Sequence, residues 1–150
     1  MNEIDPNISP VGWYVGSYLI RFIEVEDANN ADEESEFLSW ENTVIVKAKD
    51  LAEAYAKVEE IGKEHDEPYQ GGEEGILVNW IYEGVTKLLP IYEALEDGAE
   101  IMFAERESTK LKDLRKMVGP FKDYINETPN QTPRSNGYSC PRTLDSSKIK

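Results

Sequence analysis

The chain has 150 residues, of which 39% are hydrophobic and 31% are charged. Thirty Asp and Glu against sixteen Lys and Arg give a formal net charge of −14 at pH 7. Because a surface of that sign repels phosphate backbones and anionic lipid headgroups, we expect neither nucleic-acid binding nor membrane binding. The charge favours a basic protein as the partner.

The cysteine content and the start of the chain indicate where the protein works. Cys140 is the only cysteine, which excludes an internal disulfide and a zinc site of several thiolates. The first ten residues lack the basic and apolar regions of a signal peptide, and no apolar run of about eighteen residues predicts a membrane span. We expect a cytoplasmic protein with a single domain over residues 1–125.

The first half of the chain predicts a β-hairpin. Residues 13–25 are dominated by Trp, Tyr, Val, Ile and Phe at both odd and even positions, which predicts a central strand covered on both faces. Residues 26–36 are acidic and contain no aliphatic side chain larger than alanine, so we expect a solvated connection. Residues 37–49 alternate apolar with polar side chains, which is typical of a strand with one buried face.

A well-marked helix follows the second strand. Asp50 and Glu53 have the spacing of a capping box, and the apolar residues after them fall on one helical face. These signals predict a helix over residues 51–61, and Gly62 is expected to end it.

Two further strands are predicted between residues 76 and 105. A third strand is expected over residues 76–85, and residues 87–95, which Pro90 interrupts, are interpreted as irregular or a short helix. A fourth strand is expected over residues 99–105, with Ile101 and Phe103 facing inward.

The C-terminal part predicts a second helix and a tail. Ser108 is the expected cap of a helix over residues 109–118, whose buried stripe would consist of Leu111, Leu114 and Met117 or Val118. Residues 126–150 are rich in Asn, Pro, Thr, Ser and Gly, which predicts a flexible tail. The expected fold class is therefore α+β: a mainly antiparallel sheet of about four strands, one well-defined helix (51–61) packed on it, and a second, C-terminal helix (109–118).

Several strings carry a family resemblance: Trp13-Tyr14-Val15, residues 40–46 continuing through Lys49-Asp50 into the helix, residues 80–85, and the turn at residues 97–100. Through them, residues 13–105 resemble an uncharacterised bacterial family known as domain of unknown function 4288. The resemblance implies an α+β arrangement. It implies no activity, because the family carries none that can be transferred.

No pattern of residues predicts catalysis. His65, the only histidine, lies between Glu64 and Asp66, and we expect it to be exposed and solvated. Cys140 lies in the predicted tail, where no rigid surroundings would activate its thiol. The acidic residues of the first connection lack the spacing of a calcium loop. We therefore assign no catalytic, cofactor-binding or metal-binding residue and favour a protein without enzymatic activity.

The preferred hypothesis is a non-enzymatic binding protein, such as an inhibitor or a toxin-neutralising protein, that presents acidic side chains to a basic protein partner. The expected binding residues are Asp27, Asp32, Glu33, Glu34 and Glu36.

Two alternatives stay open. A small-molecule-binding domain or an unrecognised enzyme would use a cleft between the sheet and the first helix, lined by Trp40, Tyr55 and Trp80. A homodimer would join two copies through the apolar side of the first strand, where Trp13 and Tyr18 form a patch if no element covers them.

Overall fold

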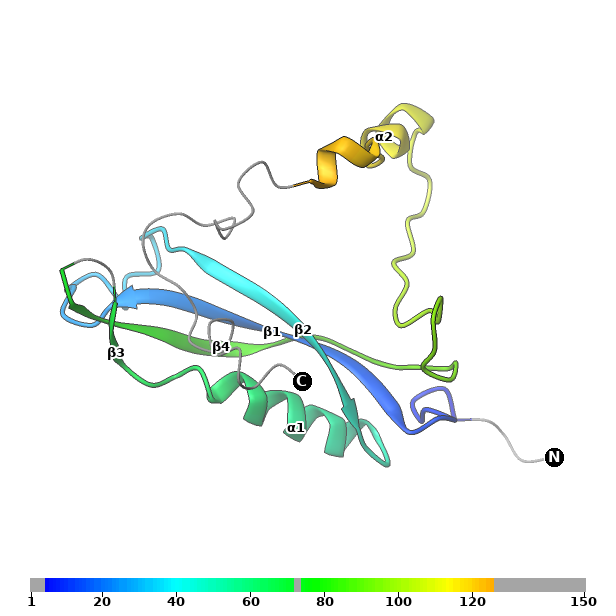
Figure 1. Ribbon diagram of the computed structural model, residues 1–150, viewed down its shortest axis with the longest axis horizontal. Coiled ribbons are helices and arrows are strands. Elements are labelled where there is room, and N and C mark those ends of the chain that lie inside the picture. Colours follow the sequence, from blue (N-terminus) through cyan, green and yellow to red (C-terminus); the bar gives the residue numbers. More distant parts are fainter. Residues whose placement is uncertain (1–4, 72–73, 126–150) are drawn as a thin grey trace.

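The computed structural model describes residues 5–71 and 74–125. Its centre is a four-stranded antiparallel sheet in the order β2-β1-β4-β3, made of β1 (Trp13–Glu24), β2 (Ser39–Lys47), β3 (Tyr69–Gly71) and β4 (Ile76–Pro90). Helix α1 (Leu51–Lys63) lies along one face of the sheet, and the short α2 (Leu111–Lys116) and the 3-10 turn η1 (Phe121–Tyr124) lie apart from it (Figure 1). The predicted α+β fold class is confirmed; the predicted tail, residues 126–150, lies outside the described residues.

β1 is the central strand that its composition predicts, although a helix, α1, covers only one of its two faces within the described residues. It pairs with β2 from Trp13 opposite Lys47 to Arg21 opposite Ser39, and with β4 along nearly its whole length. The ladder between β1 and β4 has two register shifts, beside Tyr18 and beside Ile20. Strong pairing on both sides holds the side chains of β1 at fixed positions on the two faces of the sheet.

The core lies between the sheet and α1. Trp80 is fully buried and packs against Trp40, with 4.6 Å between ring centroids, and against Phe22 at 5.2 Å. Tyr14, Tyr18 and Ile20 of β1 face the same side and are at most 1% exposed. Tyr18 is therefore covered by α1 and does not form the surface patch considered for a homodimer.

Helix α1 begins as predicted and ends later than predicted. Asp50 caps it, since its Oδ1 accepts a hydrogen bond of 2.9 Å from the backbone N–H of Glu53. Gly62 does not end the helix, because it lies buried within the last turn against Tyr82 and Tyr18. A glycine is needed there for close packing, since an added Cβ would lie 2.5 Å from Cε1 of Tyr82.

The strands after α1 differ from the prediction. Residues 87–90, expected to be irregular or helical, continue β4, and Pro90 is its last residue, where a missing N–H costs least. The remaining strand of the sheet is the short β3, which was not predicted, whereas the strand predicted over residues 99–105 does not form. The turn before them forms, with Ala99 N–H donating to the carbonyl of Glu96 at 3.0 Å. The segment lies along no strand edge, so Ile101 and Phe103 are 44% and 63% exposed and not directed inward.

The second helix is shorter than predicted, and its buried stripe is wrong. Ser108 has a φ of 50°, outside the extended conformation that a capping residue adopts, and α2 starts three residues later without a side-chain cap. None of the residues of α2 or η1 is buried. No helix in the described part of the chain combines the length and the apolar character that a bilayer crossing requires.

Candidate functional site

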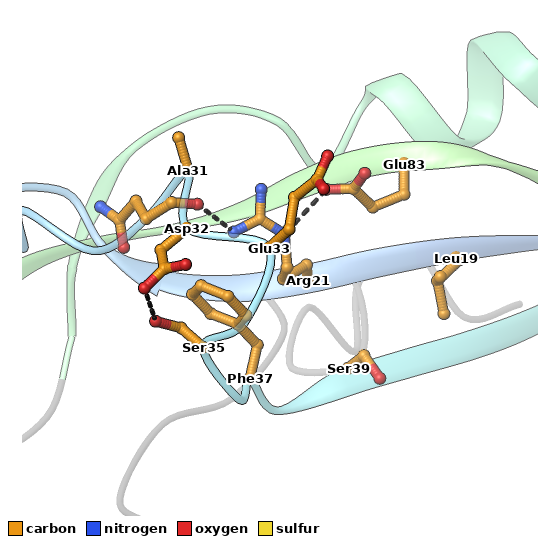
Figure 2. Close-up of a pocket in the computed structure, with 10 residues that line it drawn as sticks. Leu19, Arg21, Ala31, Asp32, Glu33, Ser35, Phe37, Ser39 and Glu83 are labelled. Carbon is orange, nitrogen blue, oxygen red and sulfur yellow. Dashed lines mark hydrogen bonds and ion pairs between the residues drawn. The ribbon is translucent and has the colours of Figure 1, made fainter.

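The sheet face opposite α1 carries an open hollow. Odd-numbered residues of β1 point to this face, and none of the described helices packs on it (Figure 1). At the end near Leu19 and Arg21, the connection between β1 and β2 bends over the sheet and borders an open hollow of about 450 Å³ (Figure 2). Its lining consists of Leu19, Arg21, Asn30, Ala31, Asp32, Glu33, Ser35, Phe37, Ser39 and Glu83.

Side chains of the connection fix its shape. Asp27 accepts a hydrogen bond of 2.8 Å from the backbone N–H of Asn29. Asp32 accepts one of 3.0 Å from the N–H of Glu34 and one of 3.1 Å from the hydroxyl of Ser35. The two contacts with backbone N–H groups are Asx turns, which Asp and Asn form readily in loops. Two of the five predicted binding residues, Asp27 and Asp32, therefore also build the loop that carries the others.

Arg21 joins the connection to the sheet. Its Nε donates to Glu83 of β4 at 2.8 Å, and another guanidinium nitrogen donates to the carbonyl of Asn30 at 2.7 Å (Figure 2). The guanidinium carbon lies 4.5 Å from the ring centroid of Phe37, a cation–π distance. Because three contacts engage this guanidinium, it is poorly placed to bind an anion and serves to position the loop.

The wall of the hollow is acidic and partly apolar. Asp32, Glu33 and Glu83 bring three carboxylates, against the single cation of Arg21. Leu19 of β1 and Phe37, which lies beside Arg21, supply the apolar part of the lining (Figure 2). Carboxylates beside an apolar surface match a Lys or Arg side chain, whose stem is apolar and whose head is cationic.

A polar bridge lies beyond the hollow on the same sheet face. Glu41 of β2 accepts a 2.6 Å hydrogen bond from the hydroxyl of Thr86 and lies 3.6 Å from the amine of Lys87, both on β4. The Thr86 hydrogen bond and the Lys87 charge lower the pKa of Glu41, against a smaller opposing effect of desolvation. Glu41 therefore stays ionised and connects β2 to β4 across β1 on this face.

The structure separates the predicted acidic residues into different places. Asp32 and Glu33 line the hollow, whereas Asp27 and Glu36 line a second depression on the same connection. Glu34 is exposed in the loop between them. Sequence reasoning missed Arg21 and Glu83. The available signal was a charged residue, Arg21 or Glu83, inside a predicted strand that is otherwise largely apolar, but nothing local indicated that these two residues, 62 positions apart, would pair.

The residues of the predicted cleft between the sheet and the helix do not line the hollow. Trp40 and Trp80 are 6% and 0% exposed within the core, whereas Tyr55 is 46% exposed on α1. The small-molecule hypothesis gains no support from this arrangement.

His65 is buried, which corrects the expectation of a solvated histidine. It is 4% exposed, and its Nε2 lies 2.8 Å from the hydroxyl of Tyr18, which also accepts a hydrogen bond from Asn42 at 3.3 Å. The extra helical residues after Ile61 carry His65 under the sheet face that α1 covers. Within residues 5–71 and 74–125, no three His, Cys, Asp or Glu side chains cluster so that they could hold a metal ion.

Comparison with known proteins places the chain in a family. No curated protein and no solved structure matches it. A family model matches residues 13–103, which are more than half of the chain and include all four strands, α1 and the hollow. The chain belongs to the family described as Domain of unknown function (DUF4288).

Proposed function

We propose that this protein is a non-enzymatic binding protein whose acidic hollow holds a basic segment of a partner protein. One observation carries the proposal: Asp32, Glu33 and Glu83 line the same hollow as the apolar side chains of Leu19 and Phe37. A Lys or Arg of the partner would place its stem on the apolar surface and its charge among the carboxylates.

The charge of the surrounding body supports the proposal. Residues 1–105 contain 25 Asp and Glu and six Lys and Arg. Such a field draws a cationic partner toward the protein and raises the association rate, most strongly at low salt. An inhibitor or a toxin-neutralising protein would use these properties, and a cytoplasmic location accords with a single cysteine in 150 residues.

The test measures the association rate of a fluorescein-labelled peptide of alternating Lys and Leu. In one variant Asp32 is replaced by Asn, and Glu33, Glu34 and Glu36 by Gln. The matched control replaces Glu60, Glu67, Glu96 and Glu105 by Gln, which are exposed and distant in sequence from the loop. At low salt we expect the loop variant to bind about tenfold more slowly and the control to stay within about twofold of the parent.

Two results would count against the proposal. An unchanged rate in the loop variant would refute the role of the acidic connection. Equal slowing in both variants would assign the attraction to the overall charge and not to the hollow. A second peptide with Gly in place of Leu tests the apolar surface, and equal binding of both peptides would remove Leu19 and Phe37 from the site.

A further inference from the structure

The C-terminal segment exposes apolar side chains that a folded monomer would normally bury. Residues 106–125 form an arm that contains α2 and η1 and projects away from the sheet (Figure 1). Seven large apolar residues of the arm are exposed: Leu111, Leu114, Met117, Val118, Phe121, Tyr124 and Ile125. Val118 and Phe121 are the most exposed, at 76% and 79%. So many exposed apolar side chains on one short segment indicate that the segment packs against another surface.

The arm also has the opposite charge to the body. It contains six Lys and Arg and three Asp and Glu, whereas residues 1–105 carry 25 acidic and six basic side chains. The basic residues alternate with the apolar ones, as in Lys110 to Lys116. The arm thus has the chemistry that the hollow fits, which is cationic groups next to apolar groups.

We infer that the arm of one copy docks in the acidic hollow of a second copy, so that two chains exchange arms and form a symmetric dimer. This inference rests on the proposed function of the hollow and names its partner. Within residues 5–71 and 74–125, no element covers the hollow or the arm, and the arm points away from its own sheet (Figure 1). A second copy can therefore fill the hollow and cover the arm without a rearrangement of either chain. Reciprocal exchange about a two-fold axis also closes the assembly, because each copy gives one arm and offers one hollow.

The experiment measures the mass of the full chain by sedimentation velocity over a range of concentrations and at two salt concentrations. An arm variant changes Val118 and Phe121 to Ser, and a hollow variant changes Asp32 to Asn and Glu33 to Gln. Because the arm residues are exposed, we expect their replacement to leave the core intact, and thermal melts of both variants test whether they fold. We expect a dimer at low salt, with a dissociation constant that rises about tenfold or more in each variant.

Two controls separate arm exchange from other dimers. Tyr55→Ser removes an exposed apolar side chain from α1 and should leave the dimer unchanged. Ile45→Ser removes one from the open face of β2, outside the hollow, and would weaken a dimer joined through the sheet. A mixture of the arm variant with the hollow variant should regain a dimer held by one arm, because each supplies the part that the other lacks.

A monomer at every concentration would overturn the inference, as would a dimer that the arm variant does not weaken. A dimer sensitive to Ile45→Ser alone would also overturn it and assign the interface to the sheet face. If the chain is monomeric while the loop variant described above still slows peptide binding, arm exchange fails and the proposed function stands. If neither effect appears, both fail.

Discussion

At the scale of single residues, Gly62 sets the distance between α1 and the sheet. A Cβ at this position would lie 2.5 Å and 2.6 Å from two ring carbons of Tyr82 and 3.1 Å from a ring carbon of Tyr18. Gly16 has the same role on β1, where an added Cβ would lie 2.5 Å from Cγ2 of Val58. Two glycines therefore let the helix lie close to the sheet, which brings His65 within hydrogen-bond distance of Tyr18.

We predict that Gly62→Ala destabilises the protein. Alanine gains about 1 kcal/mol in helix propensity, but the ring of Tyr82 cannot yield like a flexible chain end, and overpacking costs about 1–3 kcal/mol. The expected result is a lower free energy of unfolding in a urea titration.

A double-mutant cycle provides the control. Tyr82→Leu removes the ring, so Gly62→Ala should be neutral or stabilising in that background. The explanation would be wrong if alanine cost the same with and without the Tyr82 ring.

Tyr82 has a second property at this scale. Its hydroxyl oxygen is buried and has no hydrogen-bond partner among the described residues. Burial raises the pKa of this hydroxyl, and the nearby Glu59 and Tyr55 raise it further. The neutral phenol is therefore the stable form in the folded protein.

At the scale of elements, the connection from α1 to β3 is tied to β4 by side chains. Asp66 accepts a 2.8 Å hydrogen bond from the side-chain amide of Asn79, and the carbonyl oxygen of that amide accepts from the backbone N–H of Trp80 at 2.8 Å. The indole N–H of Trp80 donates to the hydroxyl of Tyr69 at 3.1 Å. The connection thus docks on the buried end of β4.

We predict that Asp66→Ala costs about 1–3 kcal/mol in the free energy of unfolding. Asn79 is 4% exposed, and loss of its acceptor would leave a buried amide hydrogen without a partner. Denaturant unfolding measures the loss, and faster amide hydrogen exchange in β3 would locate it.

Glu67→Ala is the matched control, since the neighbouring carboxylate is exposed. It should change stability by less than about 0.5 kcal/mol. Equal effects of the two substitutions would show that loss of charge, and not the Asn79 contact, explains the result.

At the scale of the whole molecule, charge is divided along the chain. Acidic residues dominate up to residue 105, and basic residues dominate from residue 106 onward. The acidic part includes the whole sheet and α1, so like charges crowd the folded body. Self-repulsion of this kind lowers the stability of a compact state and is screened by salt.

We predict that NaCl raises the melting temperature at neutral pH. If salt removes roughly 1 kcal/mol of charge repulsion between low and moderate ionic strength, the melting temperature rises by about 4 °C. The measurement uses the arm variant with Ser at positions 118 and 121, so that salt acts on folding and not on arm exchange.

The control for this effect is the variant described above in which Gln replaces four exposed glutamates, Glu60, Glu67, Glu96 and Glu105. It should melt higher at low salt and respond less to NaCl, because less repulsion is left to screen. A melting temperature that stays constant or falls with salt would contradict the argument.

The sequence by itself determined the local structure. The composition of β1, the alternation along β2 and the Asp50 cap of α1 each depend on neighbouring residues, and each prediction is confirmed within a few positions. Periodicity also predicted a buried apolar stripe within residues 109–118, and this prediction is wrong, because the structure leaves those side chains exposed.

Only the tertiary structure decided the rest. The hollow exists because Arg21 meets Glu83 and Asn30, and the burial of His65 depends on the close packing at Gly62. Residues 99–105 have a strand pattern but lie along no strand edge. Contacts between residues that are distant in the sequence depend on which surfaces pack together. A local sequence pattern can indicate that a side chain is buried, but it does not identify the residues that bury it.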